Sequence, residues 1–334
     1  MRVVQVADFG GPEVLVASDA PDPVAGPGQV VIDVSVVDVL FLDTQLRAGW
    51  GRDFFPLTPP YVPGNGVAGQ VAGVAEDVDP AWIGRRVIAR TGTRARDGGA
   101  PAAPTGGYAE RAVVAVETLV EVPDGLGSRE AAALVHDGPT ALGLADRAQI
   151  RTGEWVLITA AGGSLGVVLL QLARAAGARV IGAARGERKL RLVRELGAEA
   201  VVDYTEAGWQ DRAREATGGQ GVHVVFDGAG GELGEAAFEV ATSGARFFAY
   251  GAASGRFAAI DPAEAERRDV TMIGIMGQGR TAAQLRRLTE QAIAEAAAGR
   301  ITPFIGQTFP LERAADAHAA IAARTAIGRT LLLV

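Results

Sequence analysis

A turn of small residues directly after an apolar run constrains the fold of this chain more than any other feature. The apolar run is Trp155–Thr159, and the turn that follows reads Ala-Ala-Gly-Gly-Ser-Leu-Gly over residues 160–166. An apolar stretch then continues from Val167 to Ala176 and stops at Gly177, a residue typical of helix ends. A continuous apolar run is typical of a strand buried on both faces. The order of strand, tight turn and helix predicts a dinucleotide-binding unit.

The chemistry of the turn explains this prediction. Small residues let the backbone approach a pyrophosphate closely, and the first turn of the following helix offers free N–H groups and a positive dipole end. With 45 glycines in the chain, an ordinary tight turn is the alternative interpretation. The strand before the turn and the helix after it favour the cofactor. The predicted contacts in the turn are Ala160, Gly162, Gly163, Ser164, Leu165 and Gly166.

The next predicted strand, Arg179 to Ala184, indicates which cofactor binds. NAD sites place an acidic residue about 20 residues after the glycines, where it binds the ribose hydroxyls. Here the strand end has no carboxylate, and Arg185, Arg188 and Lys189 follow it. Such cations pair with a 2′-phosphate, so the sequence predicts NADPH. The alternative is a solvated helix start with scattered charge, and Glu187 favours that alternative.

The rest of the chain predicts two kinds of architecture, within an α/β fold class. Strands alternate with helices after Pro123, which predicts a doubly wound parallel sheet. The N-terminal third is instead β-rich, with β-branched runs at 30–36 and 67–74. The C-terminal segment does not continue the alternation. Further predicted strands are 200–202, 222–226, 246–250 and 329–334, and further predicted helices are 187–196, 281–298 and 311–324.

Several motifs in order along the chain resemble the zinc-free, quinone oxidoreductase branch of the medium-chain dehydrogenases and reductases. They are Gly10–Leu15, Phe41–Gly49, Gly106–Glu110 and the glycine turn, and the resemblance covers nearly the whole chain. It implies a GroES-like β-rich catalytic domain at 1–123, a Rossmann NADPH-binding domain at 124–268 and a C-terminal return at 269–334. Hydride would pass from the nicotinamide to a substrate in the interdomain cleft.

The resemblance also implies roles for single residues. Lys189 and Tyr204 would hold the 2′-phosphate. Family members usually have Asn where this chain has Leu40, and often Tyr where it has Gln45, both beside the nicotinamide and substrate. These departures put a quinone as the natural substrate in doubt. Other residues matching cofactor-contacting positions are Thr140, Gly163, Gly228, Gly251 and Arg324.

We predict that the chain binds no metal. It has no cysteine, and its three histidines, His136, His223 and His318, are far apart in the sequence. Zinc-dependent relatives have a His in the stretch that here reads Gly64-Asn65-Gly66. We expect His223 to be a core residue and His318 a surface or packing residue. His136 lies near the expected cofactor and is a weaker candidate for the site.

Without a metal, a conjugated C=C–C=O group is an easier substrate than a simple alcohol, because its β-carbon accepts hydride and its oxygen takes the charge. A side chain or water must then protonate the α-carbon. The candidates for catalytic residues are Asp43, Gln45 and Tyr61. Asp43 has the alternative role of capping its helix or pairing with Arg47, and Tyr61 that of packing.

The predicted function is NADPH-dependent reduction of a quinone or an α,β-unsaturated carbonyl. A specialised biosynthetic ene-reductase and a non-catalytic NADPH-binding structural or adaptor protein are the alternatives. A net charge of −7 without a basic block argues against a nucleic-acid partner. The sequence holds no apolar run of about 18 residues, so we expect no membrane span and a cytoplasmic protein. The apolar segment Val270–Met276 predicts a sheet edge that pairs in a homodimer.

Overall fold

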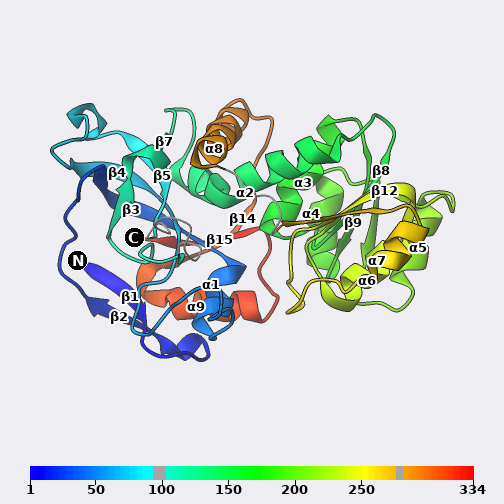
Figure 1. Ribbon diagram of the computed structural model, residues 1–334, viewed down its shortest axis with the longest axis horizontal. Coiled ribbons are helices and arrows are strands. Elements are labelled where there is room, and N and C mark those ends of the chain that lie inside the picture. The colour runs from blue at the N-terminus through cyan, green and yellow to red at the C-terminus, as the bar shows by residue number, and fades with distance from the viewer. Residues whose placement is uncertain (93–102, 276–280) are drawn as a thin grey trace. The chain divides into compact units, whose positions relative to one another are not determined.

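The computed structural model describes residues 1–92, 103–275 and 281–334. The chain forms two compact units, one of residues 1–139 and 282–334 and one of residues 140–281. Both chain ends therefore belong to the same unit, as the N and C labels in Figure 1 show. We refer to this unit as the β-rich unit and to the other as the Rossmann unit.

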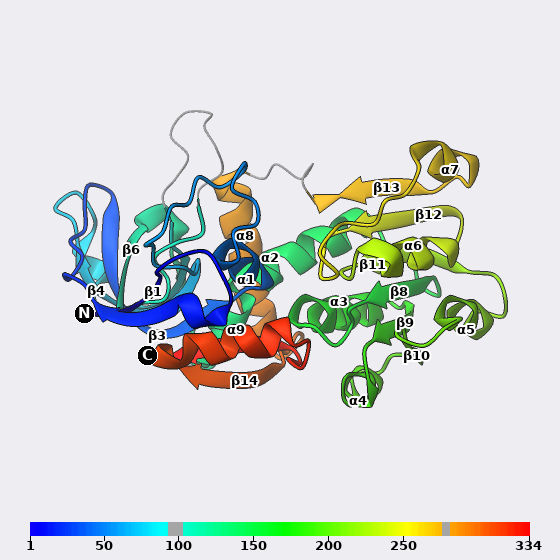
Figure 2. The ribbon, with the colours of Figure 1, turned by 90° about the horizontal axis from the view of Figure 1, so that it is seen from below.

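The Rossmann unit holds one parallel sheet of six strands in the order β10-β9-β8-β11-β12-β13 (Figure 2). This order confirms the predicted doubly wound sheet, because the chain moves outward from β8 to β10 and then returns to the other side of β8 with β11. The strands are β8 (Trp155–Thr159), β9 (Arg179–Ala184), β10 (Ala200–Asp203), β11 (Val222–Asp227), β12 (Ala241–Ala249) and β13 (Thr271–Gly274). The connecting helices are α3 (Ser164–Ala175), α4 (Glu187–Glu195), α5 (Trp209–Ala216), α6 (Gly231–Glu239) and α7 (Pro262–Arg267).

The β-rich unit holds a mostly antiparallel sheet in the order β14-β15-β3-β4-β5-β7, with β6 paired to β3. Its strands are β3 (Gln29–Val39), β4 (Gly66–Val74), β5 (Arg86–Arg90), β6 (Arg111–Ala115), β7 (Val120–Glu121), β14 (Ile305–Pro310) and β15 (Arg329–Leu333). A separate antiparallel pair joins β1 (Arg2–Val6) to β2 (Leu15–Asp19). The helices are α1 (Phe41–Arg47), α8 (Ala282–Ala297) and α9 (Ala314–Ala322), with short 3₁₀ turns at 12–14, 80–82, 116–118 and 311–313.

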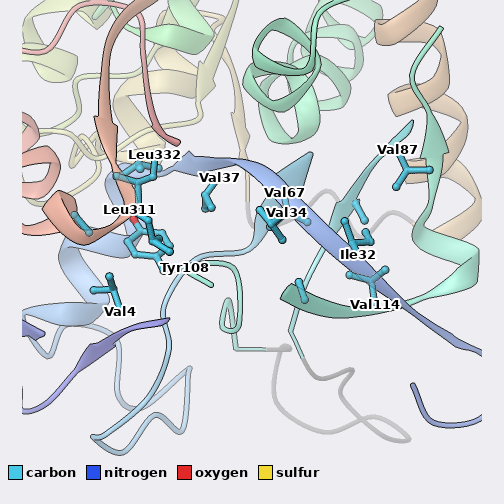
Figure 3. Packing of buried hydrophobic residues seen from close by; sticks show 14 of the residues in the cluster. Val4, Ile32, Val34, Val37, Val67, Val87, Tyr108, Val114, Leu311 and Leu332 are labelled. Carbon is cyan, nitrogen blue, oxygen red and sulfur yellow. The ribbon is translucent and has the colours of Figure 1, made fainter. Parts of the chain in front are cut away.

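The core of the β-rich unit follows from the alternation of side chains along β3. Val30, Ile32 and Val34 point inward, whereas Asp33 between them is exposed. Figure 3 shows Ile32 and Val34 among side chains from β4, β5 and β6, in the same cluster as Tyr108, Leu311 and Leu332. The C-terminal strand β15 pairs antiparallel with β3, so the last residues of the chain complete the sheet begun by the first.

Helix α2 (Ser128–Ala148) spans the boundary between the units. Its first part packs on α8 so closely that a Cβ atom at Gly138 would lie 2.5 Å from Cβ of Ala292. The β-rich unit therefore extends to residue 139 rather than to the expected 123. The Rossmann unit extends to 281 rather than 268, because β13 pairs with β12 and adds a sixth strand to the sheet.

Candidate functional site

The glycine turn connects the buried strand β8 to α3 through an unusual backbone conformation. Ala160 has a positive φ of 52°, which a non-glycine residue rarely adopts, and its carbonyl accepts a hydrogen bond from Gly163 N at 2.8 Å. Helix α3 begins at Ser164, earlier than the expected Val167, with Gly163 as its N-cap. The first N–H groups of a helix have no acceptor within the helix, so the turn presents donors to an anion.

Close contacts explain why two positions in this turn are glycine. A Cβ atom at Gly166 would lie 2.6 Å from the carbonyl oxygen of Ala160. A Cβ atom at Gly162 would lie 2.7 Å from Cβ and 3.1 Å from Cγ of Lys189. The aliphatic part of Lys189 therefore packs across the turn. Lys189 is also the only lysine in the sequence, and every other residue among the 32 lysines and arginines is arginine.

No acidic residue ends β9, where an NAD site would place one to bind the ribose hydroxyls. Ala184 ends the strand, and the exposed Arg185 follows it. Asp203, which pairs with Ala184 at the end of β10, accepts hydrogen bonds from Gly186 N at 2.8 Å and from Thr205 Oγ1 at 2.6 Å. Glu187 pairs with Arg194 at 2.7 Å. The carboxylates of this region are thus engaged with neighbouring groups.

A buried hydrogen-bond network joins β8 to β11, where the order of the strands reverses. Thr159 Oγ1 donates to Asp227 Oδ1 at 2.6 Å and accepts from Gly228 N at 3.0 Å. Burial raises the pKa of Asp227. A Cβ atom at Gly251 would lie 2.5 Å from the carbonyl oxygen of Gly228, so the loops after β11 and β12 touch. The network fixes the edge of the sheet where parallel α/β folds bind their ligands.

The structure brings together most of the residues predicted to bind the cofactor. The turn and Lys189 are in contact, Gly228 and Gly251 are in contact, and Tyr204 N donates to the carbonyl of Ala184 at 3.3 Å. Thr140 is the first residue of the Rossmann unit, and Arg324 belongs to the β-rich unit, where its guanidinium lies 5.1 Å from the centre of the Phe41 ring. Thr159, Asp227 and Tyr250 also lie at this edge of the sheet and were not predicted from the sequence. The hydroxyl of Tyr250 would lie 2.4 Å from a Cβ atom at Gly228.

The candidate catalytic residues lie in the β-rich unit. Asp43 is buried and its Oδ2 accepts from Leu40 N at 2.9 Å, which confirms its capping role at the start of α1. No ion pair joins it to Arg47 among the described residues. Tyr108 Oη instead lies 3.3 Å from Asp43 Oδ2. Burial raises the pKa of Asp43 to about 7, against the effect of the hydrogen bond from Leu40.

Gln45 and Tyr61, the other two candidates, make few polar contacts. Gln45 Nε2 lies 3.5 Å from Thr44 Oγ1. The hydroxyl of Tyr61 is buried and has no hydrogen-bond partner in the described part of the chain. Burial, with a smaller effect of Asp43, raises the pKa of Tyr61 to about 12. Neither residue is held in the way expected of an activated acid.

The three histidines have different environments. His223 Nδ1 accepts from Trp155 N at 3.1 Å, as a core residue would. His318 is fully buried, which rules out a surface position, and its Nε2 lies 2.8 Å from Tyr108 Oη. Burial lowers the pKa of His318 to about 3. His136 Nδ1 lies 2.8 Å from Asp38 Oδ2, a contact that sequence analysis did not anticipate.

The pattern of β3 contained a signal for Asp38. Asp38 stands within the apolar run 36–40, which is typical of a strand buried on both faces, so an aspartate there is expected to be buried. Past the register shift after Val34, Val37 and Val39 join the core, and Asp38 lies on the opposite face of β3. Burial of an ionisable group requires a partner. On its other side Asp38 meets Arg329, whose Nε lies 3.1 Å from Asp38 Oδ1 and whose Nη2 lies 2.6 Å from Asp137 Oδ2.

The described residues contain no group of three or more His, Asp or Glu side chains that could hold a metal ion. The absence of a metal therefore stays a prediction that rests on the residue types. In the same residues, no helix has the length and apolar character needed to cross a membrane.

Comparison with known proteins gives matches along most of the chain. Residues 26–124 match the family described as alcohol dehydrogenase GroES-like domain, and residues 164–294 match the family described as zinc-binding dehydrogenase. The chain is similar to a quinone oxidoreductase of Pseudomonas aeruginosa, with 31% identity over 99% of this chain and 98% of that protein.

Two further similarities bear on substrate and cofactor. A 2-haloacrylate reductase of a Burkholderia species is 31% identical over 97% of this chain and 96% of its own length. Among solved structures, a mycobacterial protein complexed with NADPH has 30% identity, covers 100% of both chains and superposes with a TM-score of 0.89.

Proposed function

The chain belongs to the zinc-free quinone oxidoreductase family of medium-chain dehydrogenases and reductases, and from this premise we propose that it is an NADPH-dependent reductase. Its substrate is a quinone or an α,β-unsaturated carbonyl compound. The similar proteins support both classes, since one is a quinone oxidoreductase and another reduces 2-haloacrylate, a substrate with a conjugated C=C–C=O group.

The observation that carries the cofactor proposal is the contact of Lys189 with Gly162. The glycines at 162, 166, 228 and 251 let the turn and the loops after β11 and β12 pack closely, because a Cβ atom at each would lie within 2.7 Å of another protein atom. Glycines that allow a tight turn and close packing after the strand are typical of a dinucleotide site. Lys189 and Arg185 provide positive charge beside the end of β9, where a 2′-phosphate would lie, and no carboxylate ends that strand. When bound, NADPH supplies the hydride. The residues of the chain orient the cofactor and the substrate.

The single lysine makes a direct test of this cofactor site possible. We expect an amine-specific reagent to modify Lys189 and the N-terminus, and peptide mass mapping to report the two separately. NADP⁺ should protect Lys189 and NAD⁺ at the same concentration should not, whereas the N-terminus should react equally in all samples. Equal protection by both nucleotides, or by neither, would contradict the proposed role of Lys189.

Steady-state oxidation of NADPH tests the substrate class. We expect turnover of both benzoquinone and simple cyclic enones, and no oxidation of secondary alcohols with NADP⁺. Binding of NADPH without turnover of any acceptor in such a panel would favour the adaptor alternative.

We also propose that the protein is a cytoplasmic homodimer. Strand β13 pairs with β12 on one side, and it lies at the end of the strand order, so its other side is a sheet edge. Met272 on this strand is 39% exposed. Pairing of two such edges would extend one sheet across a two-fold axis. Met276, the last residue of the predicted apolar segment, lies outside the described residues. Light scattering should give twice the chain mass, and Met272→Asp should give the monomer mass.

A further inference from the structure

We propose that His136, positioned by Asp38, is the proton donor to the α-carbon of an α,β-unsaturated carbonyl substrate. The inference rests on the proposed reductase function and adds the catalytic acid that the sequence did not identify. Protonation of carbon is slow without a positioned acid, so an ene-reductase gains rate from such a group.

The geometry of the pair is that of an imidazole oriented by a carboxylate. His136 Nδ1 lies 2.8 Å from Asp38 Oδ2, so the ring is fixed with its Nε2 edge directed away from Asp38. Asp38 is fully buried, and the His136 side chain is 16% exposed while its Nε2 atom is itself buried. A solvent-shielded carboxylate that orients an imidazole is the arrangement expected when the imidazole exchanges a proton with a ligand.

The chain is built to accommodate this ring. A Cβ atom at Gly66 would lie 2.7 Å from His136 Cε1 and 3.0 Å from Asp38 Cβ, so only glycine leaves room for the pair. Pro139 in α2 cannot donate a hydrogen bond to the carbonyl of Val135, four residues before it. Arg90 Nη2 donates to that carbonyl instead, at 3.0 Å, and so fixes the turn of α2 that carries His136.

The surroundings of the pair place it among the residues expected at the substrate. Leu40 follows Asp38 by two residues, and it occupies the position where quinone oxidoreductases usually have an Asn beside the nicotinamide. Asn65 precedes Gly66, and it occupies the position of the His in zinc-dependent relatives. Its Oδ1 is buried without a hydrogen-bond partner among the described residues.

The proton transfer balances when the pair starts with one proton on the Asp38 carboxyl and one on His136 Nε2. Hydride adds to the β-carbon, and the electrons of the C=C bond move toward the carbonyl oxygen. The α-carbon then takes the proton of His136 Nε2, while the carboxylic proton of Asp38 moves to Nδ1. The pair ends as a neutral imidazole and a carboxylate, and water returns the lost proton before the next turnover.

The electrostatic environment is consistent with this protonation state. Burial raises the pKa of Asp38 to about 7, while Arg329 and Arg90 act in the opposite direction. Burial, together with Arg90 and Arg329, lowers the pKa of His136 well below its usual range, and Asp137 acts against them. Neutral imidazole beside a carboxyl group that ionises near neutral pH is the state that the transfer requires, and the titration belongs to the pair.

The alternative is a purely structural network in which Asp38, Asp137 and Arg329 connect β3, α2 and β15. The two roles differ in what each substrate needs. An enone needs a proton on carbon, whereas a quinone takes its protons on oxygen, where transfer from water is fast. Loss of the donor should therefore slow enone reduction and spare quinone reduction, while a structural defect should affect both equally.

The test compares His136→Asn and Asp38→Asn with Asp137→Asn, which removes a partner of Arg329 but not the partner of His136. In His136→Asn we expect enone kcat to fall by about 100-fold or more, with quinone kcat retained. In Asp38→Asn we expect the decline of enone kcat above about pH 7 to disappear. Asp137→Asn should keep the wild-type ratio of enone to quinone turnover.

Two further readouts do not depend on rate. In D₂O, an α-methyl cyclic enone should give one configuration at the deuterated α-carbon with the wild type and a mixture with His136→Asn. With only three histidines in the chain, ¹⁵N spectra of the free protein should resolve the tautomer of His136 and its change in Asp38→Asn.

An equal fall, or no fall, of enone and quinone turnover in His136→Asn overturns the inference, as does an unchanged product configuration. If His136→Asn does not fold, the pH profile of Asp38→Asn decides. If the wild-type protein reduces neither substrate with NADPH, the proposed function itself is overturned. This failure is distinct from failure of the inference, because it is observed before any variant is made.

Discussion

The side chain of Lys189 lies against Gly162, with 2.7 Å between Cβ of the lysine and the place where a Cβ of residue 162 would be. The contact joins the first turn of α4 to the turn that follows β8. The lysine stem is thereby fixed beside the proposed pyrophosphate site. A fixed stem loses less conformational entropy on binding than a free one, which favours the lysine as a specific phosphate contact.

Replacement of this lysine should remove the preference for NADPH. We expect Lys189→Gln to raise KM for NADPH by about 10-fold to 100-fold, the cost of a lost charge-assisted hydrogen bond. KM for NADH should change little, because NADH carries no 2′-phosphate. Steady-state kinetics with both nucleotides and one acceptor measure this.

The matched control is Arg191→Gln on the same helix. Arg191 is exposed, and it follows Lys189 by two positions, so it lies on another face of α4. Arg191→Gln removes the same positive charge as Lys189→Gln but leaves the contact between Lys189 and Gly162 in place. If both variants lose the same affinity for NADPH, the effect is that of general charge and not of Lys189.

Gly66 and Gly73 lie on the same strand and should respond differently to an added methyl group. At Gly66 the new Cβ would lie 2.5 Å from Val135 Cγ1 and 2.7 Å from His136 Cε1, whereas at Gly73 no atom lies within 4 Å. Gly66→Ala should therefore lower the free energy of unfolding by about 1–3 kcal/mol. Gly73→Ala should leave it nearly unchanged. Denaturant titration of both variants checks this, and similar midpoints would contradict the packing seen around His136.

Burial of Asp43 predicts a pH dependence of stability. Its pKa is raised to about 7 in the folded state from 3.8, so the folded chain binds more protons than the unfolded chain between these values. The contribution of Asp43 to stability is therefore present below about pH 4 and is lost as the pH rises to about 7, by up to about 1.4 kcal/mol per pH unit.

Asp43→Asn should remove this contribution and keep the cap, because the amide oxygen can still accept from Leu40 N. The free energy of unfolding of the variant relative to the wild type should rise between pH 4 and pH 7. The exposed Asp53 provides the control, since Asp53→Asn should show no such trend. A flat difference for Asp43→Asn would contradict the buried, protonated carboxyl.

Local patterns in the sequence predict much of the fold because they depend on neighbouring residues. The apolar run at β8, the small residues after it and the Gly at 177 together determine a strand, a turn and a helix, and the structure confirms them. The start of α3 differs, since Ser164 and Leu165 already adopt helical conformation.

The candidate site is less predictable, because its contacts join residues that are distant in the sequence. Asp38 and His136 are 98 residues apart, and Tyr108 and His318 are 210 apart. The apolar run around Asp38 indicates that this residue is buried, but no local pattern identifies its partner. The surface position considered for His318 is wrong for the same reason, since Tyr108 covers it from another part of the chain.

We expect the purified protein to contain no stoichiometric zinc. It has no cysteine, Asn65 replaces the histidine of zinc-dependent relatives, and His136 is engaged with Asp38. Elemental analysis should find well below one zinc per chain, and a chelator should leave quinone reduction unchanged. One bound zinc, with activity lost to the chelator, would refute the prediction.

The last prediction concerns substrate choice at Leu40 and Gln45. The resemblance implies that both replace groups beside the nicotinamide, so we expect the pocket to offer fewer hydrogen-bond donors to the two carbonyls of a quinone. Both side chains are half-buried. Leu40 contributes to the N-terminus of α1 through its backbone N–H, and Asn is itself a favourable residue at that position. The side-chain amide of Gln45 makes a long contact of 3.5 Å with Thr44 Oγ1.

The double variant Leu40→Asn/Gln45→Tyr should therefore fold and should raise kcat/KM for quinones relative to enones. The ratio is the informative quantity, because quinones are intrinsically reactive and some turnover proves little about the pocket. Thermal unfolding of the double variant provides the control for stability, and KM for NADPH the control for the cofactor site. If the ratio stays at the wild-type value while both controls hold, these two positions do not select the substrate. The preference would then have to come from the proton donor, which an enone needs and a quinone does not.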